Sequence, residues 1–386
     1  MILKEIVNLL DNIFKKNIAL VGDNVGLQIG NLNWNIKTIL ITLDVTNNVI
    51  DEAIKNNANL IFSHHPLIHS PIQTVTNTSL TGKKIIRLVE NEAAVYVAHT
   101  NYDMASDGLN SLLAEKLGLK NVSIIKPENQ QWYKFVVFVP KEAEEKIRDV
   151  ICSGGGGKWK NYSCCTFNIE GKGTFKPLEG SHPYIGKVGD LNFVDEVRIE
   201  CIVNEENINS LVKAVVKAHP YEEPAYDIYK IENKFEDYGI GRIGELKSPE
   251  KFKSFLDKIK IAFNTTNFRW LAQNPDTNSA DEKIIKKIAL INGSANSFTD
   301  SVSLTDFECD LIIVGELKYH KSLEIAESGK IFVELGHGES EKTAIDDIYL
   351  KLKSYFDNYF SGSCKVERIN LIKSKTGFEP WRFYIE

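Results

Sequence analysis

Short apolar runs alternate with longer stretches of mixed apolar and polar residues along the first third of the chain. The apolar runs predict buried strands, and the mixed stretches predict amphipathic helices. We expect helices at 4–14, 49–56 and 81–91, and strands at 38–46, 59–62 and 93–98. Because strands and helices alternate, the pattern predicts a parallel or mixed sheet with helices on both faces.

The alternation stops near residue 125 and resumes in the last third of the chain. The segments in between follow the order strand, helix, strand, strand, helix, strand, which resembles a ferredoxin-like unit. The glycine-rich segment 238–244 is expected to be a hinge that leads back to the main domain. We therefore predict an α/β fold in which two related α/β halves, 1–127 and 241–386, form one domain, and an α+β domain, 128–240, is inserted between them.

Composition and charge limit the classes of partner. The 386 residues are 43% hydrophobic and 25% charged, which is ordinary for a soluble globular protein of two or three domains. A net charge of -6 gives no overall attraction to nucleic acid or to an anionic membrane. The first seven residues predict an amphipathic helix rather than a signal peptide, and no stretch resembles a membrane span. We expect a cytoplasmic protein that does not bind membranes, with nucleic acid an unlikely partner.

The cysteines indicate neither a zinc ribbon nor a thioredoxin-type site, because no two of them form a CxxC pair. Cys164 and Cys165 are adjacent, and a disulfide between neighbours is strained. We expect the cysteines to be reduced and partly buried.

Histidines gather where predicted strands end. The chain has eight histidines, and five of them follow predicted strands directly or within a few residues: His64, His65, His99, His320 and His337. Open α/β sheets place their ligands at the carboxyl ends of their strands, and histidine is the commonest metal ligand. A histidine pair can also cap a loop, so the pair 64–65 alone leaves both interpretations open.

Two carboxylates extend this pattern. Asp103 is either a hard oxygen ligand or a helix cap, and His99 is either a ligand or a hydrogen-bond partner of one. His337 and Glu341 are four residues apart at a strand-to-helix junction, which places both side chains on one face of a helix. Glu341 would also be favourable there for the helix dipole. Taken together, these positions predict a metal site.

Several motifs identify a family. They are SHHP at 63–66, HTNYD at 99–103, GHxxxE at 336–341, DNVGLQIG at 23–30, TLDVT at 42–46 and AHPYEEPAYDI at 218–228. Together they resemble the Nif-three-like family of dinuclear-metal proteins, whose members are called GTP cyclohydrolase 1 type 2 homologues. The resemblance spans essentially the whole chain and implies that the inserted domain is PII-like.

The resemblance implies two divalent metal ions per chain and a ring-shaped homohexamer. The implied ligands are His64, His65, Asp103, His337 and Glu341, with Glu341 bridging the two ions. Mixed histidine and carboxylate ligation suits Zn, Fe, Mn or Co better than Mg or Ca.

The expected function is a metal-dependent hydrolase that acts on a small molecule by means of a metal-activated water. The resemblance names GTP ring opening, although a phosphoester or another cyclic amide would fit the same residues. His99 and His320 are the candidate catalytic proton shuttles. The alternative is a ring-shaped metal-binding scaffold or regulatory protein without turnover.

Overall fold

The chain folds into two compact units in the computed structural model, which describes residues 1–128, 131–159, 162–233, 238–272, 280–299, 302–360 and 368–376. One unit, called here the insert, is Asn129–Glu236, and it overlaps the inserted domain expected at 128–240. The other, called the main unit, combines Met1–Glu128 with Asp237–Glu386. Among the helices that these ranges contain, none is both long and apolar enough to cross a membrane.

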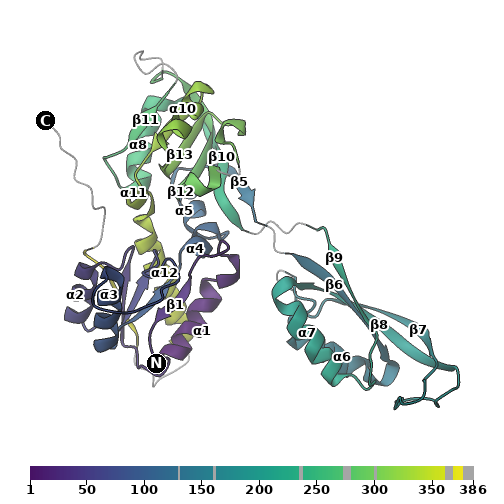
Figure 1. Cartoon of the computed structure of the whole chain (residues 1–386). Helices are drawn as coiled ribbons and strands as arrows, with labels where there is room; N and C mark the ends of the chain where they lie inside the picture. Colours follow the sequence, from purple (N-terminus) through teal and green to yellow (C-terminus); the bar gives the residue numbers. More distant parts are fainter. Residues whose placement is uncertain are drawn as a thin grey trace. The chain divides into compact units, whose positions relative to one another are not determined.

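The first sheet of the main unit has three parallel strands at its centre. In spatial order its strands are β1 (Gly26–Ile29), β4 (Ala94–Val97), β3 (Leu60–Ser63), β2 (Thr38–Thr42) and β15 (Asn370–Lys373). β1 is antiparallel to β4, and the other neighbours are parallel. Helices α2 (Asn47–Lys55) and α3 (Leu80–Glu90) connect the parallel strands, as the alternation of apolar and mixed stretches predicts (Figure 1).

The second sheet repeats this plan. Its spatial order is β11 (Arg269–Leu271), β14 (Ile331–Glu334), β13 (Leu311–Glu316), β12 (Ile284–Ser294), β10 (Gly239–Lys251) and β5 (Lys120–Pro127). β12, β13 and β14 are parallel, and the outer strands are antiparallel to them or to each other. The two α/β halves also exchange strands, because β5 precedes the insert in the sequence and β15 follows the second sheet. The α/β fold with two related halves is therefore confirmed.

One hydrophobic core contains residues of both sheets. Phe62 of β3, Ile313 of β13, Phe263 of α8 (Phe252–Phe263) and Leu352 of α12 (Thr343–Phe360) belong to it, and all four are 0% exposed. Helices α1 (Leu3–Ile13), α4 (Thr100–Met104) and α5 (Leu109–Lys116) also contribute to this core. A single core of this kind fixes the two sheets with respect to each other.

The opposite faces of the sheets are covered as well. Ile61 is next to Phe62 in β3 and points the other way, as neighbours in a strand do, where it packs with Ile50 of α2 and Leu88 of α3. On the second sheet, Ile312 packs with Ile325 of α10 (Tyr319–Glu327). Strands that are buried on both faces explain the continuous apolar runs in the sequence.

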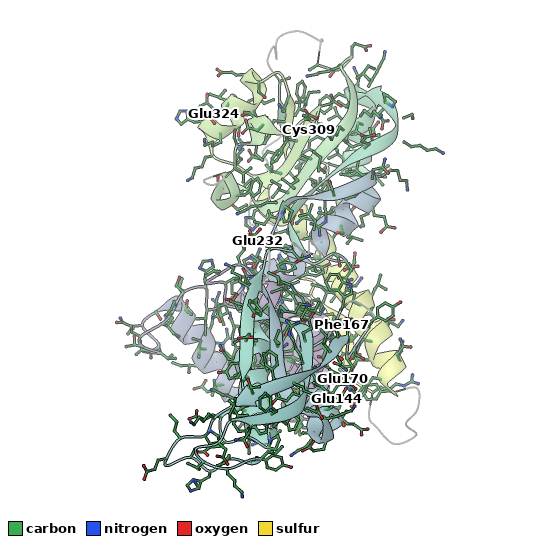
Figure 2. All side chains as sticks on the ribbon, turned by 90° about the vertical axis from the view of Figure 1, so that its right-hand side faces the viewer. Glu144, Phe167, Glu170, Glu232, Cys309 and Glu324 are labelled. Carbon is green, nitrogen blue, oxygen red and sulfur yellow. A yellow bond between two sulfur atoms is a disulfide. The ribbon has the colours of Figure 1, made fainter. Side chains whose placement is uncertain are left out.

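The insert has the ferredoxin-like topology that the sequence predicts. Its elements are β6 (Trp132–Pro140), α6 (Glu144–Ser153), β7 (Thr166–Phe175), β8 (Asn192–Asn204), α7 (Glu205–Ala218) and β9 (Tyr226–Ile231). The spatial order is β7-β8-β6-β9, and every neighbouring pair is antiparallel. Val137 of β6 and Ile199 of β8 pack with both helices, whereas Phe167 of β7 is 63% exposed (Figure 2).

The expectation of a hinge at 238–244 is wrong. The glycine-rich segment 238–244 is not a hinge, because from Gly239 onward it is the start of β10, which pairs with β5 on one side and β12 on the other. The glycines at 154–157 form an ordered turn in which each backbone N–H donates to a carbonyl of the chain. No N–H of that turn is therefore left to bind an anion.

The expectation for the cysteines is also wrong in part. Cys152 at the end of α6 and Cys164 before β7 form a disulfide, with their Cα atoms 4.9 Å apart. Cys165, Cys201 and Cys309 are free. The spacing of the cysteines in the sequence does not predict the disulfide between Cys152 and Cys164, because the turn at 154–157 brings these two residues together.

Arg242 of β10 fastens the turn that follows α4 (Thr100–Met104) to the second sheet. Arg242 is 3% exposed, and burial lowers the pKa of its guanidinium group to about 10. The guanidinium donates to the carbonyl oxygens of Ala105 and Gly241 at 2.7 and 2.8 Å and to the Ser111 hydroxyl at 2.9 Å. Since the acceptors are neutral, the interaction is a set of hydrogen bonds rather than an ion pair.

Replacing Arg242 by Met should lower the free energy of unfolding of the main unit by about 3 kcal/mol, because buried carbonyl oxygens lose their donors. Urea unfolding followed by circular dichroism measures the change. The control is Arg269→Met, which removes an arginine that is 78% exposed in its pair with Glu334 and should cost roughly 0.5 kcal/mol. Equal effects of the two substitutions would contradict this account of Arg242.

Candidate metal centre

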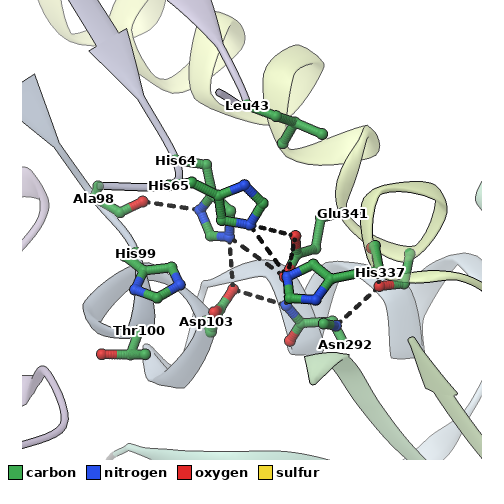
Figure 3. A network of polar contacts seen from close by, with 12 residues as sticks. Leu43, His64, His65, Ala98, His99, Thr100, Asp103, Asn292, His337 and Glu341 are labelled. Atoms are coloured by element: carbon green, nitrogen blue, oxygen red, sulfur yellow. Dashed lines mark hydrogen bonds and ion pairs between the residues drawn. The ribbon is translucent and has the colours of Figure 1, made fainter. Parts of the chain in front are cut away.

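Strand ends of both sheets supply the side chains of the site. β3 ends at Ser63, and His64 and His65 follow it directly. His99 follows β4, and Asp103 lies on the short helix α4 that comes next. His337 and Glu341 begin and end the short helix α11 (His337–Glu341), which follows β14. Figure 3 shows these side chains converging from the two halves of the main unit.

The first cluster consists of His64, Asp103 and Glu341. Nε2 of His64 lies 3.7 Å from Oδ1 of Asp103 and 3.7 Å from Oε1 of Glu341. Nδ1 of His64 is 2.9 Å from the carbonyl oxygen of Ala98, which can only accept, so Nδ1 carries the hydrogen. Nε2 is buried and has no hydrogen-bond partner.

The donor set of this cluster fits a metal ion. A neutral imidazole nitrogen and two carboxylate oxygens all offer lone pairs to the same point, and a cation satisfies all three. The raised pKa of His64 also indicates that the two carboxylates favour a positive charge at this position. Burial alone would lower that pKa, but the carboxylates of Asp103 and Glu341 outweigh burial and raise it above its ordinary value.

The second cluster consists of His65, His337 and the other oxygen of Glu341. Oε2 of Glu341 lies 2.8 Å from Nε2 of His65 and 3.3 Å from Nε2 of His337. The two Nε2 atoms are 3.3 Å apart. Nδ1 of His65 donates to Oδ1 of Asp44 at 2.9 Å, which is the usual way for a carboxylate to orient a ligating histidine.

Glu341 connects the two clusters. Its side chain is 2% exposed, and each oxygen faces a different cluster. Burial alone would raise the pKa of Glu341, but the hydrogen bond from His65 and the positive charges of His64 and His65 outweigh burial and hold it well below the ordinary value. Burial raises the pKa of Asp103. The positive charge of His64 lowers this pKa, but by less than burial raises it. Glu341 is therefore shared by two groups of possible metal ligands.

The two clusters differ in exposure. The side chain of His64 is 0% exposed and that of Asp103 is 15% exposed, whereas His65 and His337 are 19% and 35% exposed. The second cluster is therefore the one that solvent and small molecules reach more easily.

Residues of β12 complete the surroundings. Nδ2 of Asn292 donates to Oδ1 of Asp103 at 2.9 Å. Gly293 has a φ of +59°, and its N–H donates to the Ser340 hydroxyl at 2.9 Å. A Cβ atom at position 293 would lie 2.2 Å from Oε1 of Glu341. Only glycine therefore allows the backbone to pass this close to the carboxylate.

Sequence reasoning gave no role to Asp44, Asn292 or Gly293. In the structure Asp44 comes just after the end of β2 and Asn292 lies near the end of β12, whereas the predicted strand 38–46 placed Asp44 inside a strand. The signal for Gly293 is weaker, because the close approach of Glu341 depends on tertiary structure.

The structure brings together six of the seven predicted site residues. His99 lies beside the clusters, with its ring centroid 5.4 Å from that of His64 and 5.7 Å from that of His65. His320 is exposed at the start of α10, and within the described ranges no hydrogen bond or ion pair joins it to either cluster. The residue that reaches the site from the end of β13 is Glu316, 3.4 Å from Nδ1 of His337.

Substituting Gly293 by Ala should weaken metal binding by about tenfold or more, because the added methyl group displaces the Glu341 carboxylate. Titration of the metal-free protein with Mn²⁺ measures the affinity. Gly329→Ala is the matched control, since Gly329 also has a positive φ, +82°, but a Cβ there has nothing within 4 Å. The control should lose about 1 kcal/mol of stability and keep its metal affinity. Equal metal affinity in both variants would contradict the proposed contact.

Comparisons with known proteins show which family the chain belongs to. A family model described as Duf34/NIF3 (NGG1p interacting factor 3) matches residues 1–374. A GTP cyclohydrolase 1 type 2 homolog of Halalkalibacterium halodurans is 38% identical over 333 residues, which are 86% of this chain and 87% of the relative. A protein of Bacillus subtilis with the same name is 35% identical over 381 residues, 98% of each chain.

A solved structure has the same fold. The Bacillus cereus protein related to NIF3 superposes with a TM-score of 0.79 and 34% identity, covering 100% of this chain and 99% of that one. Because the family model spans nearly the whole sequence and the relatives match over most of their lengths, the chain belongs to the Duf34/NIF3 family.

Proposed function

We propose that this protein is a hydrolase that uses two divalent metal ions per chain. The observation that carries the proposal is the buried Glu341 carboxylate, whose two oxygens face two separate clusters of possible ligands. One ion would be held by His64, Asp103 and Oε1 of Glu341. The other would be held by His65, His337 and Oε2 of Glu341.

The chemistry of these ligands limits the metal and the reaction. A mixture of imidazole and carboxylate groups suits zinc, iron, manganese or cobalt better than magnesium or calcium. Two such ions lower the pKa of a bound water and stabilise negative charge on the group under attack. The greater exposure of His65 and His337 supports an approach of the substrate from their side.

His99 is the proposed proton shuttle. It belongs to neither cluster around Glu341 but forms a third group of possible ligands with His64 and His65, whose rings lie within 6 Å of its own. It is therefore close enough to exchange a proton with a group bound at the metal pair. His320 lacks this proximity, and we give it no role.

The proposed substrate is a small molecule with a hydrolysable ring or ester. GTP is the first candidate, because relatives with 38% and 35% identity carry the name GTP cyclohydrolase 1 type 2 homolog. A phosphoester would use the same groups. We also propose that the chains assemble into a ring-shaped homohexamer, as the family resemblance implies.

Protein purified without chelator or affinity-tag metal should contain about two metal ions per chain. Glu341→Ala should lose most of both, since the bridging carboxylate contributes to both clusters. Elemental analysis measures the metal content. The metal-loaded parent should consume GTP or p-nitrophenyl phosphate, and the variant should not.

The control for this experiment is Glu339→Ala on the same short helix. The Glu339 carboxylate pairs with Nζ of Lys342 at 2.7 Å, away from the clusters, so this variant should keep both metal ions and the activity. A parent that takes up no metal even after reconstitution would overturn the proposal. A parent with two metal ions and no turnover of either compound would favour the metal-binding scaffold instead.

Metal binding should release protons and strengthen as the pH rises. Burial alone would lower the pKa of His65, but Asp44 and Glu341 outweigh it and raise that pKa to about 10 in the absence of metal. At pH 7 the incoming ion must therefore displace a proton from Nε2 of His65, and each displaced proton changes the affinity by about tenfold per pH unit. Calorimetric titration with Mn²⁺ in buffers of different ionisation enthalpy should give at least one proton per chain. A binding heat that is independent of the buffer would contradict this prediction.

A further inference from the structure

A buried carboxylate, that of Asp23, contacts Nδ1 of His99. The side chain of Asp23 is 8% exposed, and its oxygens lie 2.9 and 3.0 Å from Nδ1 of His99. The backbone N–H and the hydroxyl of Thr100 also donate to Oδ2 of Asp23. Burial alone would raise the pKa of Asp23, but the hydrogen bonds from His99 and Thr100 outweigh it and hold that pKa below its ordinary value.

These contacts determine which nitrogen of His99 carries the hydrogen. An ionised carboxylate only accepts, so Nδ1 of His99 is the donor, and in the neutral imidazole Nε2 then keeps a lone pair. The ring nitrogens of His64, His65 and His99 form one group in which a ligand atom of each lies within 4.8 Å of the others. Figure 3 shows His99 beside His64 and Asp103. With Nδ1 bonded to Asp23, Nε2 is the nitrogen available to the site.

The segment that carries Asp23 is anchored independently of His99. Nδ2 of Asn24 donates to the carbonyl oxygen of Ile68 at 2.7 Å. The amide of Gln28 makes two bonds to the same residue: Oε1 accepts from the N–H of Ile68 at 2.9 Å, and Nε2 donates to its carbonyl oxygen at 3.2 Å. The segment 23–28 is thus bonded both to the loop after His65 and to the start of α4.

We propose that Asp23 is a positioning residue for His99. It fixes the ring and the Nδ1–H tautomer so that Nε2 presents a lone pair toward the metal pair. Among the described residues, Asp23 belongs to none of the groups of possible metal ligands, and its oxygens accept hydrogen bonds from His99 and Thr100. The consequence for catalysis rests on the proposed function, whereas the tautomer of His99 can be measured without it.

The substitution Asp23→Asn tests the proposal because an amide has only one oxygen. The backbone N–H of Thr100 requires an acceptor, so the oxygen would occupy the place of Oδ2 and the NH₂ group would face Nδ1 of His99. Both lone pairs of that oxygen would accept from the N–H and the hydroxyl of Thr100, so Nδ1 would accept from the NH₂ group and the hydrogen would move to Nε2. The same reversal of a histidine tautomer follows from an aspartate-to-asparagine change in serine proteases.

Nitrogen NMR of metal-free protein labelled with ¹⁵N-histidine reports the tautomer directly. His99→Gln identifies the resonances of His99 among those of the eight histidines. The parent should show a protonated Nδ1 and an unprotonated Nε2, and Asp23→Asn should lose this pattern. Asp23→Glu, which restores a carboxylate, should recover at least part of it. An unchanged His99 pattern in Asp23→Asn would overturn the proposal.

Gln28→Ala separates positioning from a general loosening of the segment. It removes the bonds to Ile68 and leaves Asp23 and His99 unchanged, so it should keep the Nδ1–H pattern. The same loss of pattern in Gln28→Ala would show that Asp23 has no specific role.

Elemental analysis of Asp23→Asn should give the same metal content as the parent, because no ligand is removed, and a loss of metal would mean that Asp23 supports the ligands instead. A parent that binds no metal would overturn the proposed function and would leave the tautomer result standing.

Discussion

The carboxylate of Glu341 lies buried between two groups of imidazole nitrogens, and positive charge is required on both sides of it. A buried carboxylate without a compensating charge costs several kcal/mol. Protons on the histidines can supply part of the compensation, which is why the pKa values of His64 and His65 are raised. Nε2 of His64 nevertheless has no hydrogen-bond partner. Two cations, one for each oxygen, would satisfy every one of these groups.

The architecture of the main unit meets this requirement by joining the strand ends of two sheets. The first sheet provides His64 and His65 after β3 and Asp103 after β4, and the second provides the helix α11 with His337 and Glu341. Ligands that come from different sheets keep their spacing only if the sheets are fixed relative to each other. The common hydrophobic core and the exchange of β5 and β15 between the halves provide this constraint. Arg242 adds to it by holding the turn that directly follows α4.

Much of this could be predicted from the sequence, because the relevant signals are local. Continuous apolar runs predicted the parallel strands, and the polar residues that follow them predicted a metal site. The family resemblance implied His64, His65, Asp103, His337 and Glu341 as its ligands. His320 was selected as one of the polar residues after predicted strands and does not reach the site, because β13 ends at Glu316 and the chain has already entered α10 at His320.

Features that depend on contacts between distant segments could not be predicted in this way. The bonds of Asp23 to His99 span 76 residues of sequence, and those of Arg242 to the turn after α4 span more than 130. The disulfide between Cys152 and Cys164 depends on the conformation of a glycine turn. The glycines at 238–244 predict a hinge by composition, and only pairing with β5 and β12 makes this segment a strand.

Anomalous diffraction from crystals of the Mn²⁺-loaded protein tests the central claim most directly, because it locates the ions relative to Glu341. The account predicts two anomalous peaks about 3.5–4 Å apart, one beside His64 and Asp103 and the other beside His65 and His337, with the Glu341 carboxylate between them. A single peak, or peaks that do not contact Glu341, would contradict it.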